Sequence, residues 1–215
     1  MGISGFTRIS TVIVPDKYLS IISVSADGDM DPEPIRASLE ADKGSLDYLA
    51  VDSDSDPLDF PDLYRDIKSV RPKGLKVLII TDGRDPTVLD DLIGAGYAHA
   101  IDLLVGKELN GKQRECISIA ADNGCKYAVT VKAKDHSKES LTAVARGCDG
   151  CSMFILTQDR KDPVSKSDLS ILTTAAKIAT WNVRMNRSRG YHSTKFSKVA
   201  ANAGLRPRLL SLMYF

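Results

Sequence analysis

Short apolar runs alternate along the chain with amphipathic segments. The runs are rich in Ile, Val and Leu and are mostly continuous, a pattern typical of strands that are buried on both faces of a parallel sheet. The predicted strands are residues 18–25, 46–52, 75–81, 99–105, 126–131 and 152–157, with 181–185 as a candidate seventh and residues 5–14 as a leading strand or hairpin.

The segments between these strands have the apolar spacing of helices. Their starts carry Pro61, Pro86 and the candidate caps Asp85 and Ser137. Left-handed helix ends are expected at four glycines, Gly94, Gly96, Gly124 and Gly147. The predicted helices are residues 34–41, 61–70, 86–93, 112–123, 138–146 and 167–179. Six βα repeats in a row predict an α/β fold, either a parallel (β/α) barrel or a doubly wound sheet. We favour the barrel, partial and similar to a TIM barrel.

Composition narrows the class of protein. The chain has 215 residues, 43% of them apolar and 27% charged, which suits one globular domain over residues 1–191. A net charge of +1 gives no field that favours nucleic acid or a membrane surface. No apolar run approaches the roughly 20 residues that span a bilayer, and no signal peptide is seen, so a cytoplasmic protein is expected. The basic and apolar tail, residues 192–215, is expected to pack on the barrel, on a protein partner or in a homodimer.

Aspartates gather after three consecutive predicted strands. They are Asp27, Asp29 and Asp31, then Asp52, Asp54 and Asp56, then Asp82 and Asp85. The carboxyl ends of parallel strands meet at one rim, which carries the active site in α/β barrels. Carboxylates there suit Mg²⁺ or Ca²⁺, and the predicted metal ligands are Asp27, Asp31, Asp54 and Asp56. The competing interpretation is that aspartate is common in turns and at helix caps.

The opening GISGFTRISTVIVPDKYLSIISV resembles the start of the radical S-adenosylmethionine activating enzymes, the proteins that activate anaerobic ribonucleotide reductase and pyruvate formate-lyase. In that family a cysteine triad with the spacing C-x3-C-x2-C follows and binds a four-iron cluster. Here Asp27, Asp31 and Pro34 stand at the triad positions, and neither carboxylate nor proline replaces a thiolate on an iron–sulfur cluster. The resemblance therefore implies the fold without the cluster.

The same resemblance implies a cofactor site. The family's Gly-Gly-Glu-Pro motif, which holds S-adenosylmethionine, corresponds to Asp54-Ser55-Asp56-Pro57, and its Thr-Asn-Gly corresponds to Thr81-Asp82-Gly83. The Arg-rich end of the last strand corresponds to residues 183–187, including Arg184. The positions carried over as cofactor-binding are thus Asp54, Ser55, Asp56, Thr81, Asp82 and Arg184. Loss of both glycines makes S-adenosylmethionine binding weak or absent.

Two further motifs carry less weight. Cys148 and Cys151 form a CxxC, which alone is weak evidence for zinc. Cys125 and Cys148 precede the fifth and sixth predicted strands and suggest a dithiol or metal pair with Cys116 or Cys151, but small buried side chains are the favoured interpretation. Residues 106–113 resemble a phosphate loop, yet Gln113 stands where that motif needs a hydroxyl.

Two functions remain open on the sequence. The first is a non-catalytic binding or regulatory protein that holds a small anionic ligand or a protein partner at a remodelled barrel mouth. The second is a divalent-metal enzyme acting on a small anionic substrate through the Asp-rich mouth.

Overall fold

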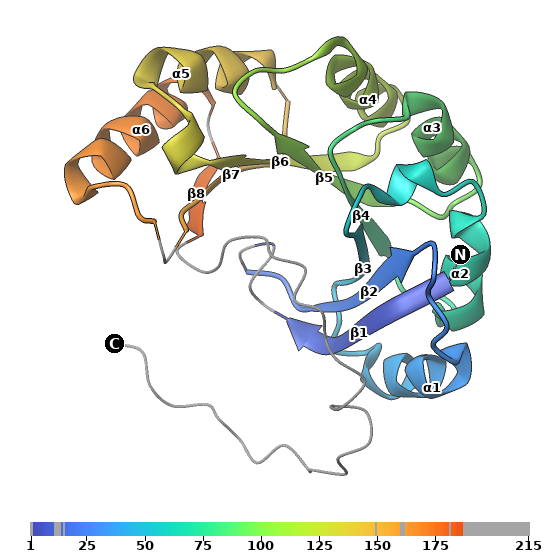
Figure 1. Cartoon of the computed structure of the whole chain (residues 1–215). Helices are drawn as coiled ribbons and strands as arrows, with labels where there is room; N and C mark the ends of the chain where they lie inside the picture. Colours follow the sequence, from blue (N-terminus) through green and yellow to red (C-terminus); the bar gives the residue numbers. More distant parts are fainter. Residues whose placement is uncertain are drawn as a thin grey trace.

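A curved eight-stranded sheet carries helices on its outer side (Figure 1). The structure is a computed structural model that describes residues 2–10, 14, 16–148, 150–159, 162–180 and 182–186. The strands are β1 (Gly2–Ser10), β2 (Leu19–Ser25), β3 (Tyr48–Ser53), β4 (Val77–Thr81), β5 (Ala100–Val105), β6 (Lys126–Lys132), β7 (Met153–Thr157) and β8 (Val183–Asn186). The helices are α1 (Pro32–Asp42), α2 (Leu63–Val70), α3 (Pro86–Gly94), α4 (Gly111–Asp122), α5 (Lys138–Gly147) and α6 (Lys166–Ala179), with short 3-10 turns η1 (Pro57–Asp59) and η2 (Ala133–Asp135).

The strands pair in sequence order. β1 is antiparallel to β2, and β2 to β8 are parallel to one another. The predicted α/β class, the six βα repeats and the candidate seventh parallel strand are confirmed. The order does not reverse, as it does in a doubly wound sheet, and it is the order that the predicted parallel barrel requires.

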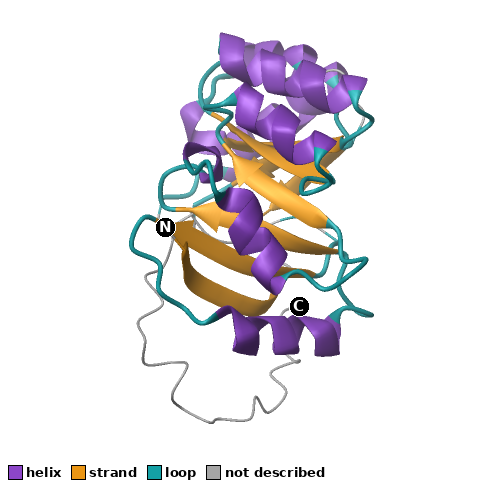
Figure 2. Ribbon diagram, turned by 90° about the vertical axis from the view of Figure 1, so that its right-hand side faces the viewer, coloured by secondary structure: helices purple, strands orange, loops and turns teal. Residues whose placement is uncertain are grey.

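Alternation along each strand sends side chains to two apolar layers. Leu49, Val51 and their equivalents on other strands belong to the larger apolar cluster, on the side of the sheet that the helices cover. Figure 2 shows the helices outside the curved sheet. The inner face has its own smaller cluster, made of Val14, Leu19, Ile21, Ala50, Leu78, Ile80, Ala100, Ala128 and Ile155. Burial on both faces explains why the strands are almost continuously apolar in the sequence.

Local capping follows the sequence closely. Asp85 accepts hydrogen bonds from the backbone N–H groups of Thr87 and Val88, and Ser137 forms a capping box with Ser140, as predicted. The predicted left-handed glycines are confirmed at Gly96 and Gly124, where φ is 73° and 64°. The prediction was wrong for Gly94 and Gly147, which are the last residues of α3 and α5.

The loop after β2 is fixed against the first strand. A Cβ on Gly28 would lie 2.0 Å from the carbonyl oxygen of Gly2, so the two backbones touch only because Gly28 has no side chain. The Met30 N–H also donates to the carbonyl of Ile3 at 3.0 Å. This loop contains Asp27 and Asp31, the first two positions compared above with a cysteine triad, and the third, Pro34, lies in α1.

The tail 192–215 and Arg187 lie outside the described residues, so the interactions predicted for them stay predictions. Within the described ranges, no helix has both the length and the apolar character needed to cross a bilayer.

Candidate functional site

The carboxyl ends of β3 to β7 surround a cavity of about 580 Å³, which we call the mouth. Five of the six predicted cofactor residues line it: Asp54, Ser55, Asp56, Thr81 and Asp82. The sixth, Arg184, does not line it. Arg184 pairs with Ile155 in the β7–β8 register, and its guanidinium lies 3.9 Å from the carboxylate of Asp16. The remaining lining residues are Asp52, Ser53, Ile80, Leu104, Val105, Gly106, Thr130, Lys132, Lys134, Asp135, Thr157, Gln158 and Asp159.

Asp56 holds the acidic side of the mouth together. Its carboxylate accepts from the Thr81 hydroxyl at 2.7 and 2.8 Å, the Leu58 N–H at 2.8 Å and the Asp82 N–H at 2.6 Å. It thereby caps η1 and ties that turn to the end of β4. Burial, and then the neighbouring Asp82 side chain, raise the pKa of Asp56. With both oxygens engaged by protein donors, Asp56 acts as a structural cap.

Asp52, near the end of β3, has one carboxylate oxygen without a hydrogen-bond partner. It sits on the inner face, lines the mouth, and its Oδ1 is buried without a hydrogen-bond partner. Burial raises the pKa of Asp52, and Asp54 nearby raises it further. Asp54 itself is exposed at the rim. A hydrogen bond with the Ser23 side chain lowers the pKa of Asp52, and its buried Oδ1 is closed to solvent.

The other two predicted metal ligands lie in the loop after β2. Asp27 accepts from the Ser25 hydroxyl at 2.8 Å, and Asp31 caps α1 by accepting from the Glu33 N–H at 3.0 Å. Neither lines the mouth beside Asp54. Within the part of the chain that the structure describes, no three His, Cys, Asp or Glu side chains are arranged to hold a metal ion.

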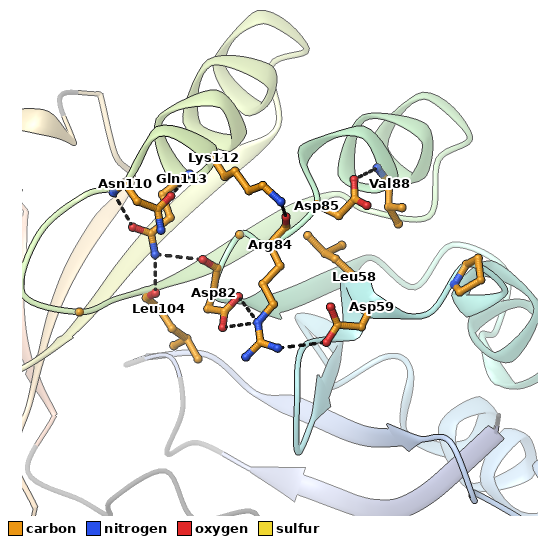
Figure 3. A pocket seen from close by; sticks show the side chains of 13 residues that line it. Leu58, Asp59, Asp82, Arg84, Asp85, Val88, Leu104, Asn110, Lys112 and Gln113 are labelled. Carbon is orange, nitrogen blue, oxygen red and sulfur yellow. Dashed lines mark hydrogen bonds and ion pairs between the residues drawn. The ribbon is translucent and has the colours of Figure 1, made fainter.

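A second cavity of about 810 Å³ adjoins the mouth and shares Asp82, Leu104 and Gly106 with it. Figure 3 shows Arg84 donating to Asp82 and Asp59, and Lys112 donating to the Arg84 carbonyl at 2.7 Å. Both cationic side chains are therefore engaged by the protein.

The loop that resembles a phosphate loop ends at this second cavity. Asn110 and Gln113 form a capping box at the start of α4. The Gln113 amide also donates to the carbonyls of Asp82 and Leu104, at 2.9 and 3.1 Å. Gln113 is thus a structural bridge between two strand ends.

Sequence reasoning missed the acid on β5. Asp102 lies on the inner face between Ile80 and Ala128 in the strand register and is 1% exposed. Its Oδ1 accepts from the Thr130 hydroxyl at 2.7 Å, and its Oδ2 is buried without a partner. Burial raises the pKa of Asp102 to about 6, although the Thr130 hydrogen bond lowers it. A charged residue inside an apolar run was the signal that could have identified it.

Thr130 connects this buried acid to the mouth. Thr130 pairs with Leu104, one step nearer the strand ends than Asp102, and both Thr130 and Leu104 line the cavity. Two residues further on, Lys132 lies on the same face and is exposed. No described residue forms an ion pair with Lys132, whereas Lys134 pairs with Asp162 at 3.1 Å. The β6 side of the mouth therefore offers a hydroxyl and an unpaired ammonium.

The donor set does not fit the iron–sulfur cluster of the resembling family. The positions of its thiolates hold two oxygen acids and a proline inside α1. Cys125 and Cys151 come one and two residues before β6 and β7, at the opposite end of the sheet from the mouth. All four cysteines are free and buried, as the favoured interpretation held. Burial raises the pKa of Cys125 to about 11 and that of Cys116 and Cys148 to about 12, so these thiols stay protonated.

In comparisons with known proteins, no family model and no curated protein matches the chain.

Proposed function

We propose that the chain is a partial (β/α) barrel of the radical S-adenosylmethionine type that has lost its cluster and acts as a non-catalytic binding protein. Its ligand is a small polar molecule held in the mouth. The observation that carries the proposal is the convergence of Asp54, Ser55, Asp56, Thr81 and Asp82 on one cavity. These residues come from two neighbouring strand ends, and Asp56 and Thr81 are 25 positions apart in the sequence.

The division of roles inside the mouth supports binding. Asp56 and Thr81 are hydrogen-bonded to each other, so they fix the shape of the cavity. Lys132 on the β6 side is exposed and has no ion-pair partner among the described residues, so a ligand can satisfy it. No nucleophile–base pair with an orienting third group accompanies them in the described residues that line the mouth, so binding is the better-supported role.

The test is a thermal-shift screen with small carboxylates, amines and nucleosides, S-adenosylmethionine included. The blocking variant is Ser55→Trp at the mouth, and its matched control is Ser170→Trp on the exposed side of α6. A ligand at about 100 times its Kd stabilises by about 2.7 kcal/mol, or about 5–10 °C in Tm for a chain of this size. The rise should appear in the wild type and the control and vanish in Ser55→Trp. Rises that survive Ser55→Trp, or a panel with no binder, would refute the proposal.

A divalent-metal enzyme is the second candidate, favoured by the partnerless Oδ1 of Asp52 beside Asp54. Mg²⁺ or Mn²⁺ at millimolar concentration should then raise Tm in the wild type and in Glu115→Gln, an exposed acid on α4, but not in Asp54→Asn. Asp56 is a poor choice for this test because its replacement breaks the cap with or without metal. Equal responses of all three proteins would exclude metal binding at Asp54.

A further inference from the structure

The β6 side of the mouth has a feature that the resemblance does not account for. Thr130 lines the cavity, while the acid that receives its hydrogen bond lies beneath the floor and is closed to solvent. A buried carboxylate with one oxygen unpaired is costly, and a native fold keeps such a group only where something compensates it.

We propose that Thr130 and Lys132 form a carboxylate-binding subsite of the mouth, and that Asp102 takes up one proton when the carboxylate binds. This inference rests on the proposed function, since it names the ligand class of the same mouth. With Asp102 ionised, Thr130 donates its hydroxyl hydrogen to Asp102 and presents only lone pairs to the cavity. A ligand carboxylate then meets an acceptor and is repelled.

Protonation of Asp102 reverses the direction of this hydrogen bond. One proton from solvent forms the O–H bond of the Asp102 carboxyl, which donates to the Thr130 oxygen. The Thr130 hydrogen turns toward the cavity and donates to the ligand carboxylate, whose charge Lys132 balances. The proton comes from solvent and stays on Asp102, so nothing else is consumed.

The surroundings of Asp102 favour it as the group that takes up the proton. Asp102 pairs with Ile80 on β4 and with Ala128 on β6, and both of these neighbours are apolar. The charged groups next along the inner face are Asp52 on β3 and Lys132 on β6. At the rim of the same side stand Lys134, Asp135 and Asp159, and His136 follows η2 with its pKa lowered by burial. Only Asp102 is hydrogen-bonded to Thr130 among the described acids.

Formate, the smallest carboxylate, is the probe, and methylammonium is the matched cation. Backbone amide shifts of the full chain are followed by NMR during titration at pH 7.5 and 5.5. Formate should shift the β6 amides of Thr130 and Lys132, and its affinity should rise by about 25-fold at the lower pH, because the protonated fraction of a group with a pKa of about 6 rises by that factor. Methylammonium should leave those amides unchanged.

Three variants separate Asp102 from the other titrating groups. Asp102→Asn mimics the protonated acid, so it should bind formate with the low-pH affinity at both pH values. Thr130→Val should bind weakly at both, and Thr130→Ser should restore the wild-type behaviour. A pH dependence that survives Asp102→Asn would assign it to another group, Asp52, Asp56 or His136, and overturn the proposal.

Failure of the subsite and failure of the mouth are distinguishable. If the thermal-shift screen finds mouth ligands but formate never shifts β6, or binds equally at both pH values, the subsite is refuted while the binding function stands. If neither experiment detects a ligand blocked by Ser55→Trp, both fall.

Discussion

Replacing Asp56 by alanine removes one carboxylate that three donors share at the base of the mouth. The Leu58 N–H, the Asp82 N–H and the Thr81 hydroxyl would each lose an acceptor 2.6 to 2.8 Å away. Asp56 is 1% exposed and Thr81 is fully buried, so these groups are largely shielded from bulk water. Each orphaned buried donor costs about 1–3 kcal/mol.

The expected loss of unfolding free energy is about 3 kcal/mol. Three orphaned donors set a range of about 3–9 kcal/mol. The lower end applies because the pKa of Asp56 is raised by burial, so removing the acid also removes an unfavourable charge. For a chain of this length the loss corresponds to a fall of about 6–12 °C in Tm. Asp54→Ala, two residues away and exposed, should change stability by no more than about 0.5 kcal/mol.

Urea unfolding followed by circular dichroism measures the difference between the two variants. Asp56→Asn is the intermediate case, since it keeps one acceptor oxygen but places an amide against the Asp82 N–H. If Asp56→Ala costs no more than Asp54→Ala, the cap is not holding the mouth and Asp56 becomes available as a ligand-binding group.

Three further predictions concern the loop after β2, the buried acid and the cluster positions. Gly28→Ala should destabilise strongly, because its Cβ would meet the Gly2 carbonyl oxygen at 2.0 Å, whereas Gly44→Ala, with open space at its Cβ, should not; thermal unfolding compares them. Since the folded pKa of Asp102 is raised from 3.8 to about 6, its contribution to stability is largest below pH 4 and is lost as the pH rises through 6. The loss is about 3 kcal/mol, and Asp102→Asn should abolish it in urea titrations between pH 4 and 7. Anaerobic reconstitution with iron and sulfide should yield no stoichiometric cluster by elemental analysis and visible absorbance, because Asp27, Asp31 and Pro34 replace the thiolates.

Each of these has an outcome that contradicts it. Equal stability of the two alanine variants would mean that the loop carrying Gly28 is not held against β1. An unchanged pH profile in Asp102→Asn would assign the profile to Asp52 or Asp56, whose pKa values are also raised. Stoichiometric iron and labile sulfide would remove the basis of the proposed function.

The sequence was informative wherever the physics is local or periodic. The predicted strand at residues 126–131 differs from β6 by one residue. The buried run of five residues in this strand is bounded by the exposed Lys126 and Lys132, which mark its limits in the sequence. The presence of Asp54 and Asp82 in the lining of one cavity also followed from sequence, since neighbouring parallel strands end at the same rim.

What the sequence could not supply were partners made by the fold. Thr81 lies 25 positions after Asp56, so the role of Asp56 as a cap, in place of a predicted metal ligand, depends on contacts that no spacing rule indicates. Thr130 and Asp102 are separated by 28 positions in the same way. Gly147 was misassigned because a glycine at a helix end can be either the last helical residue or the left-handed residue after it.

The wall shared by the two cavities has a consequence for communication within the molecule. Asp82 lines both cavities. Its N–H donates to the Asp56 carboxylate, and its own carboxylate accepts a hydrogen bond from Arg84. A ligand that draws the Asp82 carboxylate toward the mouth must loosen Arg84, whose other carboxylate partner, Asp59, belongs to the turn that Asp56 caps. A ligand in the mouth that binds the Asp82 carboxylate would therefore compete directly with a cation of the second cavity.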